Sequence, residues 1–284
     1  MIFDCHIHMS GGGLGGDEGA GQKARDKTLF RERLNQAGIA GGVVLSVAPP
    51  AFGNTKPGRD TAKNAIDEVI AFTAGDPDLF PFFWIDPIED GAAEQVDMAA
   101  EAGVAGFKTI CAKHYPQDDR AMKIYERIAA KKLPMLFHSG ILYNPGPSGE
   151  YNRPCNFEHL LFIDGLRFAM AHISWPWCDE LIAVFGKWNY LVNGAKAATS
   201  ELFVDLTPGT PTIYREEALR KLLTVGYAPL VDHMIFGTDA LDDYDVEWVK
   251  MCVSRDALIY DKFILSAEIR EKIFHKNLMA FLGK

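Results

Sequence analysis

Residues 2–8 read IFDCHIH, a short apolar run that ends in two histidines one residue apart. In an extended strand, successive side chains alternate between the two faces, so His6 and His8 are expected on one side and Cys5 and Ile7 on the other. Two imidazoles on the same side of a strand end provide half of a typical zinc site. This stretch therefore predicts a first strand that carries functional groups at its carboxyl end.

Seven further apolar runs rich in β-forming residues follow along the chain. They lie at residues 41–47, 79–85, 104–110, 133–139, 167–173, 202–207 and 233–239. Between them, residues 121–132 and 267–283 have helical periodicity, and Gly283 is suited to a helix C-cap. Strands that alternate with helices indicate a parallel sheet, and eight such repeats predict an α/β fold, a single (β/α)8 TIM barrel over residues 1–284. A doubly wound open sheet is the structural alternative.

Composition restricts the class of partner. The 284 residues are 48% hydrophobic and 24% charged, which is ordinary for a globular chain with a sizeable core. The formal net charge of −9 argues against a surface built for nucleic acid or acidic lipid. A locally cationic pocket can still bind an anion, so we expect a small-molecule substrate, anionic in character, and no nucleic-acid or membrane partner. The sequence is compatible with a homodimer but does not decide the oligomeric state.

The cysteines indicate the cellular compartment. The 5 cysteines are scattered, and no two of them form a C-x-x-C pair, which is the pattern of a reduced intracellular chain. No apolar run approaches the roughly 18 residues that span a bilayer. The first expected strand begins at Ile2, which leaves no room for a basic leader segment before it. We therefore expect a cytoplasmic protein.

Residues 11–16 read GGGLGG and fit the pattern G-x-G-x-x-G after a strand. They lead into Asp-Glu-Gly rather than into an apolar helix start, which argues against a dinucleotide-binding turn. We expect a mobile loop over the site instead.

Potential metal ligands also lie at the ends of three later strands. The fifth expected strand ends near His138, the sixth near His172 and the eighth in Asp239. A TIM barrel keeps its catalytic residues at the carboxyl ends of its strands. Four of the eight strands, the first included, therefore present zinc-ligand residue types where a barrel enzyme would need them.

This arrangement resembles the amidohydrolase superfamily, in which the same residue types occur in the same order along the chain. The stretches DCHIHM at residues 4–9 and FGTDA at residues 236–240 are most similar to the amidohydrolase-related branch, which includes lactone hydrolases and aromatic-acid decarboxylases. The resemblance covers the chain from its first strand to its last.

The resemblance implies a role for each of these residues. His6, His8 and Asp239 would ligate a divalent metal. His138 would be a further protein ligand. His172 would face the substrate, where it polarises a carbonyl group or stabilises an oxyanion. We expect one zinc ion, with manganese as the alternative.

Elementary chemistry supports these roles independently. Three or four nitrogen and oxygen ligands with one open position lower the pKa of a zinc-bound water towards about 7. Asp239 could also accept the proton from that water and pass it to the leaving group. Asp4 lies on the same side as His6 and deeper in the strand, so we expect it to orient a ligand imidazole.

Lys108, in GFKTI of the fourth expected strand, has two possible roles. A carbamylated lysine at this position bridges two metals in binuclear members of the superfamily, whereas a cationic lysine could hold a substrate carboxylate. We favour one metal and a cationic Lys108. Trp175, Tyr143 and Arg153 follow strand ends and are candidates for the wall of the substrate pocket.

Together these features predict a metal-dependent hydrolase that uses a metal-activated water on a small lactone, ester or amide, one bearing a carboxylate. A metal-dependent non-oxidative decarboxylase of an aromatic or unsaturated acid is the alternative, because the same residues support that chemistry. A barrel that binds a ligand without turning it over is a second alternative.

Overall fold

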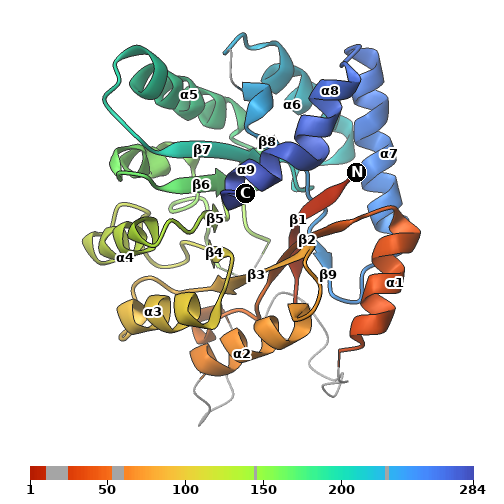
Figure 1. Ribbon diagram of the computed structural model, residues 1–284. Coiled ribbons are helices and arrows are strands. Elements are labelled where there is room, and N and C mark those ends of the chain that lie inside the picture. Colours follow the sequence, from red (N-terminus) through yellow and green to blue (C-terminus); the bar gives the residue numbers. More distant parts are fainter. Residues whose placement is uncertain (11–24, 53–60, 144–145, 228–229) are drawn as a thin grey trace.

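Nine parallel strands form one sheet, and helices surround it (Figure 1). The computed structural model describes residues 1–10, 25–52, 61–143, 146–227 and 230–284, so the GGGLGG stretch at 11–16 lies outside the described residues. The strands are β1 (Phe3–His8), β2 (Gly41–Leu45), β3 (Leu79–Trp84), β4 (Gly106–Thr109), β5 (Met135–Phe137), β6 (Arg167–Met170), β7 (Glu201–Asp205), β8 (Met234–Ile235) and β9 (Ala240–Leu241).

The connections are helical, as the alternation in the sequence predicts. The α-helices are α1 (Lys27–Ala37), α2 (Thr61–Thr73), α3 (Ala92–Ala102), α4 (Asp119–Ala130), α5 (Cys178–Asn189), α6 (Thr212–Thr224), α7 (Val246–Lys262), α8 (Ala267–Glu271) and α9 (Asn277–Leu282). A 3-10 segment, Pro154–Phe162, occupies the connection from β5 to β6. The helix expected over 267–283 is divided by a π-helical turn at Lys272–Lys276, and it ends at Gly283 in the left-handed conformation.

The sheet follows chain order from β1 to β8, and β9 pairs with β1 on its other edge. Of the predicted (β/α)8 TIM barrel, the parallel α/β architecture in TIM-like order is therefore confirmed. The last expected strand, 233–239, is divided into β8 and β9, so the ladder holds nine strands rather than eight. Cys5 N of β1 donates a hydrogen bond of 2.9 Å to Phe236 O, just beyond β8. None of the helices in the described residues is both long and apolar enough to span a membrane.

A register shift between Asp4 and Ile7 interrupts the pairing of β1 with β2. Strict alternation would put Cys5 and Ile7 in the same environment. The structure instead buries Cys5 in an inner cluster of strand residues closed by α9, and Ile7 in the cluster between sheet and helices. Such irregularities re-aim side chains and are common beside active sites. The shift separates the apolar start of β1 from the end that carries the two histidines.

A buried ion pair connects the helices behind the sheet to the end of β7. Arg215 of α6 donates through Nε and Nη2 to the Asp256 carboxylate of α7, at 3.1 and 2.6 Å. The same Nη2 donates to Leu206 O at 2.6 Å, directly after β7. The Arg215 and Asp256 side chains are 1% and 0% exposed, so this cation depends on these partners rather than on water.

We expect Asp256→Ala to destabilise the fold by about 3–5 kcal/mol, because it leaves the buried Arg215 guanidinium without its carboxylate. Glu216→Ala is the matched control, since Glu216 pairs with Lys262 on the surface. Its effect should stay within about 1 kcal/mol. Urea unfolding of both variants measures the difference. Equal midpoints and slopes for the two would show that the buried pair does not anchor α6 and α7.

Candidate active site

A pocket of about 190 Å³ opens at the carboxyl ends of the strands. Its lining combines polar groups from five strand ends with an apolar wall. The lining residues are His6, His8, Lys108, Ile110, His138, Ile141, Leu142, Tyr143, His172, Pro208, Gly209 and Asp239. A small volume with a few convergent polar groups is the usual form of a site for a small ligand.

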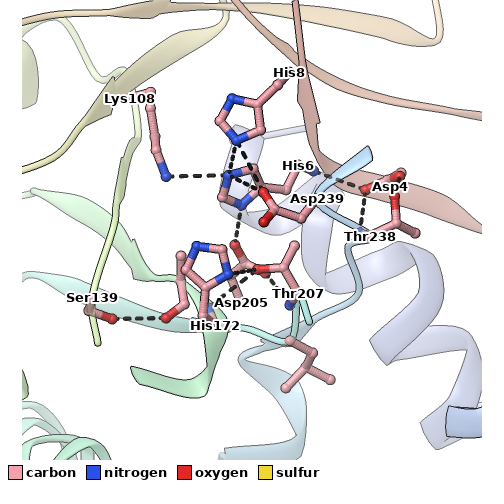
Figure 2. Close-up of polar contacts among 12 residues, drawn as sticks. Asp4, His6, His8, Lys108, Ser139, His172, Asp205, Thr207, Thr238 and Asp239 are labelled. Atoms are coloured by element: carbon pink, nitrogen blue, oxygen red, sulfur yellow. Dashed lines mark hydrogen bonds and ion pairs between the residues drawn. The ribbon is translucent and has the colours of Figure 1, made fainter. Parts of the chain in front are cut away.

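Three donor atoms converge in this pocket (Figure 2). His6 Nε2 lies 3.1 Å from His8 Nε2, which in turn lies 3.1 Å from Asp239 Oδ1. The third side of the triangle, from His6 Nε2 to Asp239 Oδ1, is 3.5 Å. Among the described residues this is the one group of three or more histidine, cysteine or acidic side chains with ligand atoms within 4.8 Å of one another.

The spacing of these donors fits a metal ion. Two donors that each lie about 2.1 Å from a tetrahedral zinc ion are about 3.4 Å apart. Two imidazoles with one carboxylate are also a donor set that zinc accepts. His138 lines the same pocket without joining the group of three, and its buried Nε2 has no hydrogen-bond partner among the described residues.

The buried imidazoles are kept neutral, which is the form that binds metal. Burial, and then the charge of Lys108, hold the pKa of His6 well below its usual value. Burial and the neighbouring His172 do the same for the pKa of His138. Burial lowers the pKa of His172 to about 4. At neutral pH these rings therefore present lone pairs or N–H groups rather than positive charges.

Asp239 provides the negative charge of the site. Burial alone would raise the pKa of Asp239, but the neighbouring His172 and the hydrogen bond with His8 outweigh it and hold this pKa well below its usual value. The side chain is 34% exposed, so the carboxylate is open to the pocket. It is therefore ionised and accessible.

His172 and Asp239 both lie beyond the ends of their strands. β5, β6 and β8 end one, two and four residues before His138, His172 and Asp239. The backbone of His172 has φ 62° and that of Asp239 has φ 60°, a left-handed region that few non-glycine residues adopt. Strain of this kind is stored at functional sites and is held by the surrounding structure.

The carboxylate of Asp205, which the strand-end pattern did not predict as a site residue, contacts the ring of His6. His6 Nδ1 donates to Asp205 Oδ2 at 2.8 Å, and both side chains are 0% exposed. Asp205 ends β7, and Thr207, two residues further, lies 3.0 Å from His172 Nδ1 through its hydroxyl oxygen. The signal was present in LFVDLT, an acidic residue near a strand end that precedes a Pro-Gly loop.

Asp4 orients backbone rather than an imidazole. Its carboxylate accepts hydrogen bonds of 3.0 Å from His6 N, Thr238 N and the Tyr244 hydroxyl, and a further one from the Thr238 hydroxyl. Burial raises the pKa of Asp4 to about 7 despite these donors. Asp4 therefore ties β1 to the segment that carries Asp239, while Asp205 contacts the ring of His6.

Lys108 lies inside the pocket, at the end of β4. Its side chain is buried, and its Nζ is 3.3 Å from His6 Nε2 (Figure 2). Burial lowers the pKa of Lys108 to about 8, so the amine remains mostly protonated at neutral pH. It is the only lysine or arginine among the residues that line the pocket in the described part of the chain.

The other three candidate substrate residues lie in different places. Tyr143 lines the pocket and is exposed. Trp175 stacks on Tyr214 with ring centroids 5.0 Å apart and is not among the lining residues. Arg153 pairs with Glu180 on the surface and also lies outside the lining. The structure thus brings one of the three to the pocket.

The chain belongs to the amidohydrolase family, because the family model described as Amidohydrolase matches residues 3–284. It is therefore an enzyme of the amidohydrolase type, and this family generally uses a divalent metal. No curated protein sequence matches the chain significantly.

Several solved structures share the fold. A probable 2-pyrone-4,6-dicarboxylic acid hydrolase from Acinetobacter baumannii, with citric acid bound, is 12% identical with a TM-score of 0.57, and the match covers 100% of this chain and 99% of that one. Dihydroorotase from Campylobacter jejuni is 14% identical with a TM-score of 0.58, over 100% of this chain and 83% of that one. A D-hydantoinase is 14% identical with a TM-score of 0.51, over 84% and 57%. At these identities the likeness shows the fold alone.

Gly209 leaves room for His172, since a Cβ at Gly209 would lie 2.7 Å from the His172 Cβ. We expect Gly209→Ala to displace His172 and to lower the free energy of unfolding by about 1–3 kcal/mol through overpacking. Gly146→Ala serves as control, because its Cβ would meet nothing within 4 Å. Thermal or urea unfolding checks this, and equal stability of both variants would contradict the close contact.

Lys108 should make the stability of the metal-free protein depend on alkaline pH. The unfolded chain holds this proton up to a pKa near 10.5, and the folded chain only up to about 8. The unfolded state therefore binds more protons in this window, and raising the pH through it should stabilise the fold by on the order of 3 kcal/mol. The Lys108→Met variant should not show this rise in stability, because it has no amine to titrate. Urea unfolding from pH 8 to 10.5 compares the two, and parallel curves would show that the burial of Lys108 does not shift its pKa.

Proposed function

We propose that this enzyme is a metal-dependent hydrolase of a small lactone, ester or amide that bears a carboxylate. The observation that carries the proposal is the convergence of His6 Nε2, His8 Nε2 and Asp239 Oδ1 within 3.5 Å of one another in a pocket. Family membership favours an enzyme over a barrel that only binds a ligand.

His6, His8 and Asp239 would hold one divalent cation, with zinc as the first choice and manganese as the alternative. The unpartnered Nε2 of His138 makes it the further candidate ligand. When bound, the cation supplies Lewis acidity that activates water and polarises a carbonyl oxygen.

The remaining steps belong to side chains of the chain itself. The ionised, accessible Asp239 accepts a proton from the attacking water and returns it to the leaving oxygen or nitrogen as the carbon–heteroatom bond breaks. His172 is kept neutral by burial and faces the pocket, so it can donate a hydrogen bond to the carbonyl oxygen as negative charge develops there.

Lys108 supports the choice of an anionic substrate. A buried, largely protonated amine can bind a carboxylate strongly because little water competes with it. The similar hydrolase from Acinetobacter baumannii is described as acting on a dicarboxylic acid and was solved with citric acid, which supports a carboxylate-bearing substrate here. The small pocket and its wall of Ile110, Ile141 and Leu142 favour a compact substrate with an apolar part.

The whole chain, residues 1–284, would form a single domain whose sheet closes into a barrel. The hydrogen bond from Cys5 N to Phe236 O and the pairing of β9 with β1 support closure between the first and last strands. Closure would place six polar side chains of the pocket around one mouth, namely His6, His8, Lys108, His138, His172 and Asp239.

We expect His6→Ala and Asp239→Asn to abolish activity and to lower the metal content below that of the unmodified protein, because each removes a ligand. Asp239→Asn should remain folded, since its side chain is partly exposed and the change is isosteric. His6→Ala should also fold but with a lower free energy of unfolding, because it leaves the buried Asp205 carboxylate without its partner. Elemental analysis of protein purified without chelator, with circular dichroism, measures metal and fold. His275→Ala is the control, since His275 stacks on Phe3 and does not line the pocket.

The products distinguish the reaction class. Hydrolysis in ¹⁸O-labelled water places one labelled oxygen in the new carboxylate of the product. Decarboxylation instead releases carbon dioxide and leaves the organic product without label. Absence of any transition metal, together with no binding of added zinc or manganese, would contradict the proposed mechanism.

A further inference from the structure

Asp205, the last residue of β7, and Thr207, two residues beyond it, contact two histidines of the site (Figure 2). Asp205 touches the ring of His6, and Thr207 touches the ring of His172. Each contact is made to Nδ1, which leaves Nε2 of both rings free of these partners. Which nitrogen of a neutral imidazole carries the hydrogen is decided by such a contact.

Asp205 fixes the hydrogen of His6 on Nδ1. Burial raises the pKa of Asp205, and the hydrogen bonds from Thr207 oppose this shift. In its ionised form the carboxylate only accepts hydrogen bonds, so in that form the 2.8 Å contact has His6 donate from Nδ1. Nε2 of His6 then holds a lone pair, and it is this atom that faces His8 and Asp239. The ring is presented in the form that can ligate a cation.

The contact between Thr207 and His172 has a different chemistry. The Thr207 hydroxyl oxygen lies 3.0 Å from His172 Nδ1 and accepts a hydrogen bond of 3.3 Å from the backbone N of the same histidine. A hydroxyl can donate as well as accept, so it can supply a hydrogen to Nδ1. His172 would then carry its own hydrogen on Nε2, towards the pocket.

We propose that Thr207 is a positioning residue that donates its hydroxyl hydrogen to His172 Nδ1, and that with Asp205 it sets His172 and His6 in opposite tautomers. The inference rests on the proposed function, because only the tautomer with hydrogen on Nε2 lets a neutral His172 donate to a substrate carbonyl. His6 offers a lone pair to a cation, and His172 offers a hydrogen to an oxyanion.

The acceptors around Thr207 favour this assignment. The Asp205 carboxylate lies within hydrogen-bonding reach of the Thr207 hydroxyl and is the competing acceptor for its hydrogen, but it already accepts His6 Nδ1 at 2.8 Å and Thr207 N at 2.6 Å. The buried thiol of Cys5 is hydrogen bonded to the same carboxylate. His172 Nδ1, in contrast, has Thr207 as its one hydrogen-bond partner in the described part of the chain.

Ring ¹⁵N chemical shifts of histidine-labelled protein test the assignment directly, because they separate protonated from unprotonated nitrogens. The protein is studied as purified and after zinc addition, and His172→Gln identifies the His172 signals. We expect His172 to be protonated on Nε2 in the unmodified protein. A hydrogen on Nδ1 would mean that Thr207 donates to Asp205 instead, and it would overturn the proposal.

Two substitutions at Thr207 give a matched pair. Thr207→Val keeps the shape and removes the hydroxyl, whereas Thr207→Ser keeps the hydroxyl and removes a methyl group. We expect Thr207→Val to mix the His172 tautomers and to lower kcat by about 10- to 100-fold, with KM and metal content nearly unchanged. Thr207→Ser should restore the tautomer and most of kcat. Unaltered tautomers in folded Thr207→Val would overturn the proposal.

Asp205→Asn tests the role of Asp205 separately from that of Thr207. Its amide can donate to His6 Nδ1 and so place the hydrogen on the wrong nitrogen, and we expect metal affinity to fall by about 10- to 100-fold. A Thr207→Val protein that loses metal as Asp205→Asn does would contradict the division of roles. If the unmodified protein hydrolyses nothing and binds no metal, the hydrolase proposal fails, while an Nε2 hydrogen on His172 would still support the role of Thr207.

Discussion

The buried hydrogen bond from His6 Nδ1 to Asp205 Oδ2 joins the first strand to the seventh, across 199 positions of sequence. Both side chains are 0% exposed, so bulk solvent does not compete with this bond. The bond therefore fixes the plane of the His6 ring and, through it, the point at which the other donors meet. The arrangement of β1 and β7 around the pocket and the protonation of His6 follow from this single contact.

The buried carboxylate of Asp4 fixes the position of the backbone in the same way as Asp205 fixes the ring of His6. Asp4 receives hydrogen bonds from β1 and from Thr238 and Tyr244, so it fixes where the chain turns into Asp239. Gly237 allows the segment before Asp239 to pack closely against Cys5 of β1 and Thr207. A Cβ at Gly237 would lie 2.5 Å from the Thr207 methyl carbon and 2.8 Å from the Cys5 sulfur. The two buried acids thus align three segments that are far apart in sequence.

The sequence predicted the strand order, the helical connections and the strand-end groups, because period and residue type are local properties. It also placed His6, His8, His138, His172 and Asp239 at strand ends, and the resemblance to the amidohydrolase superfamily implied that His6, His8 and Asp239 act together as ligands. It did not predict the register shift in β1, which depends on pairing with β2, or the role of Asp205, whose partner is distant in the chain. Arg153 was expected near the pocket from loop position alone, but its partner Glu180 lies on the surface.

The inner cluster of strand residues is closed by Leu278, Phe281 and Leu282 of α9, the last helix of the chain. The ring of Phe281 in α9 packs against Phe82 of β3 and Phe203 of β7. During synthesis the interior of the sheet cannot be sealed until this helix has left the ribosome. The apolar inner face of the early strands therefore stays incompletely covered until residues 277–282 have been synthesised.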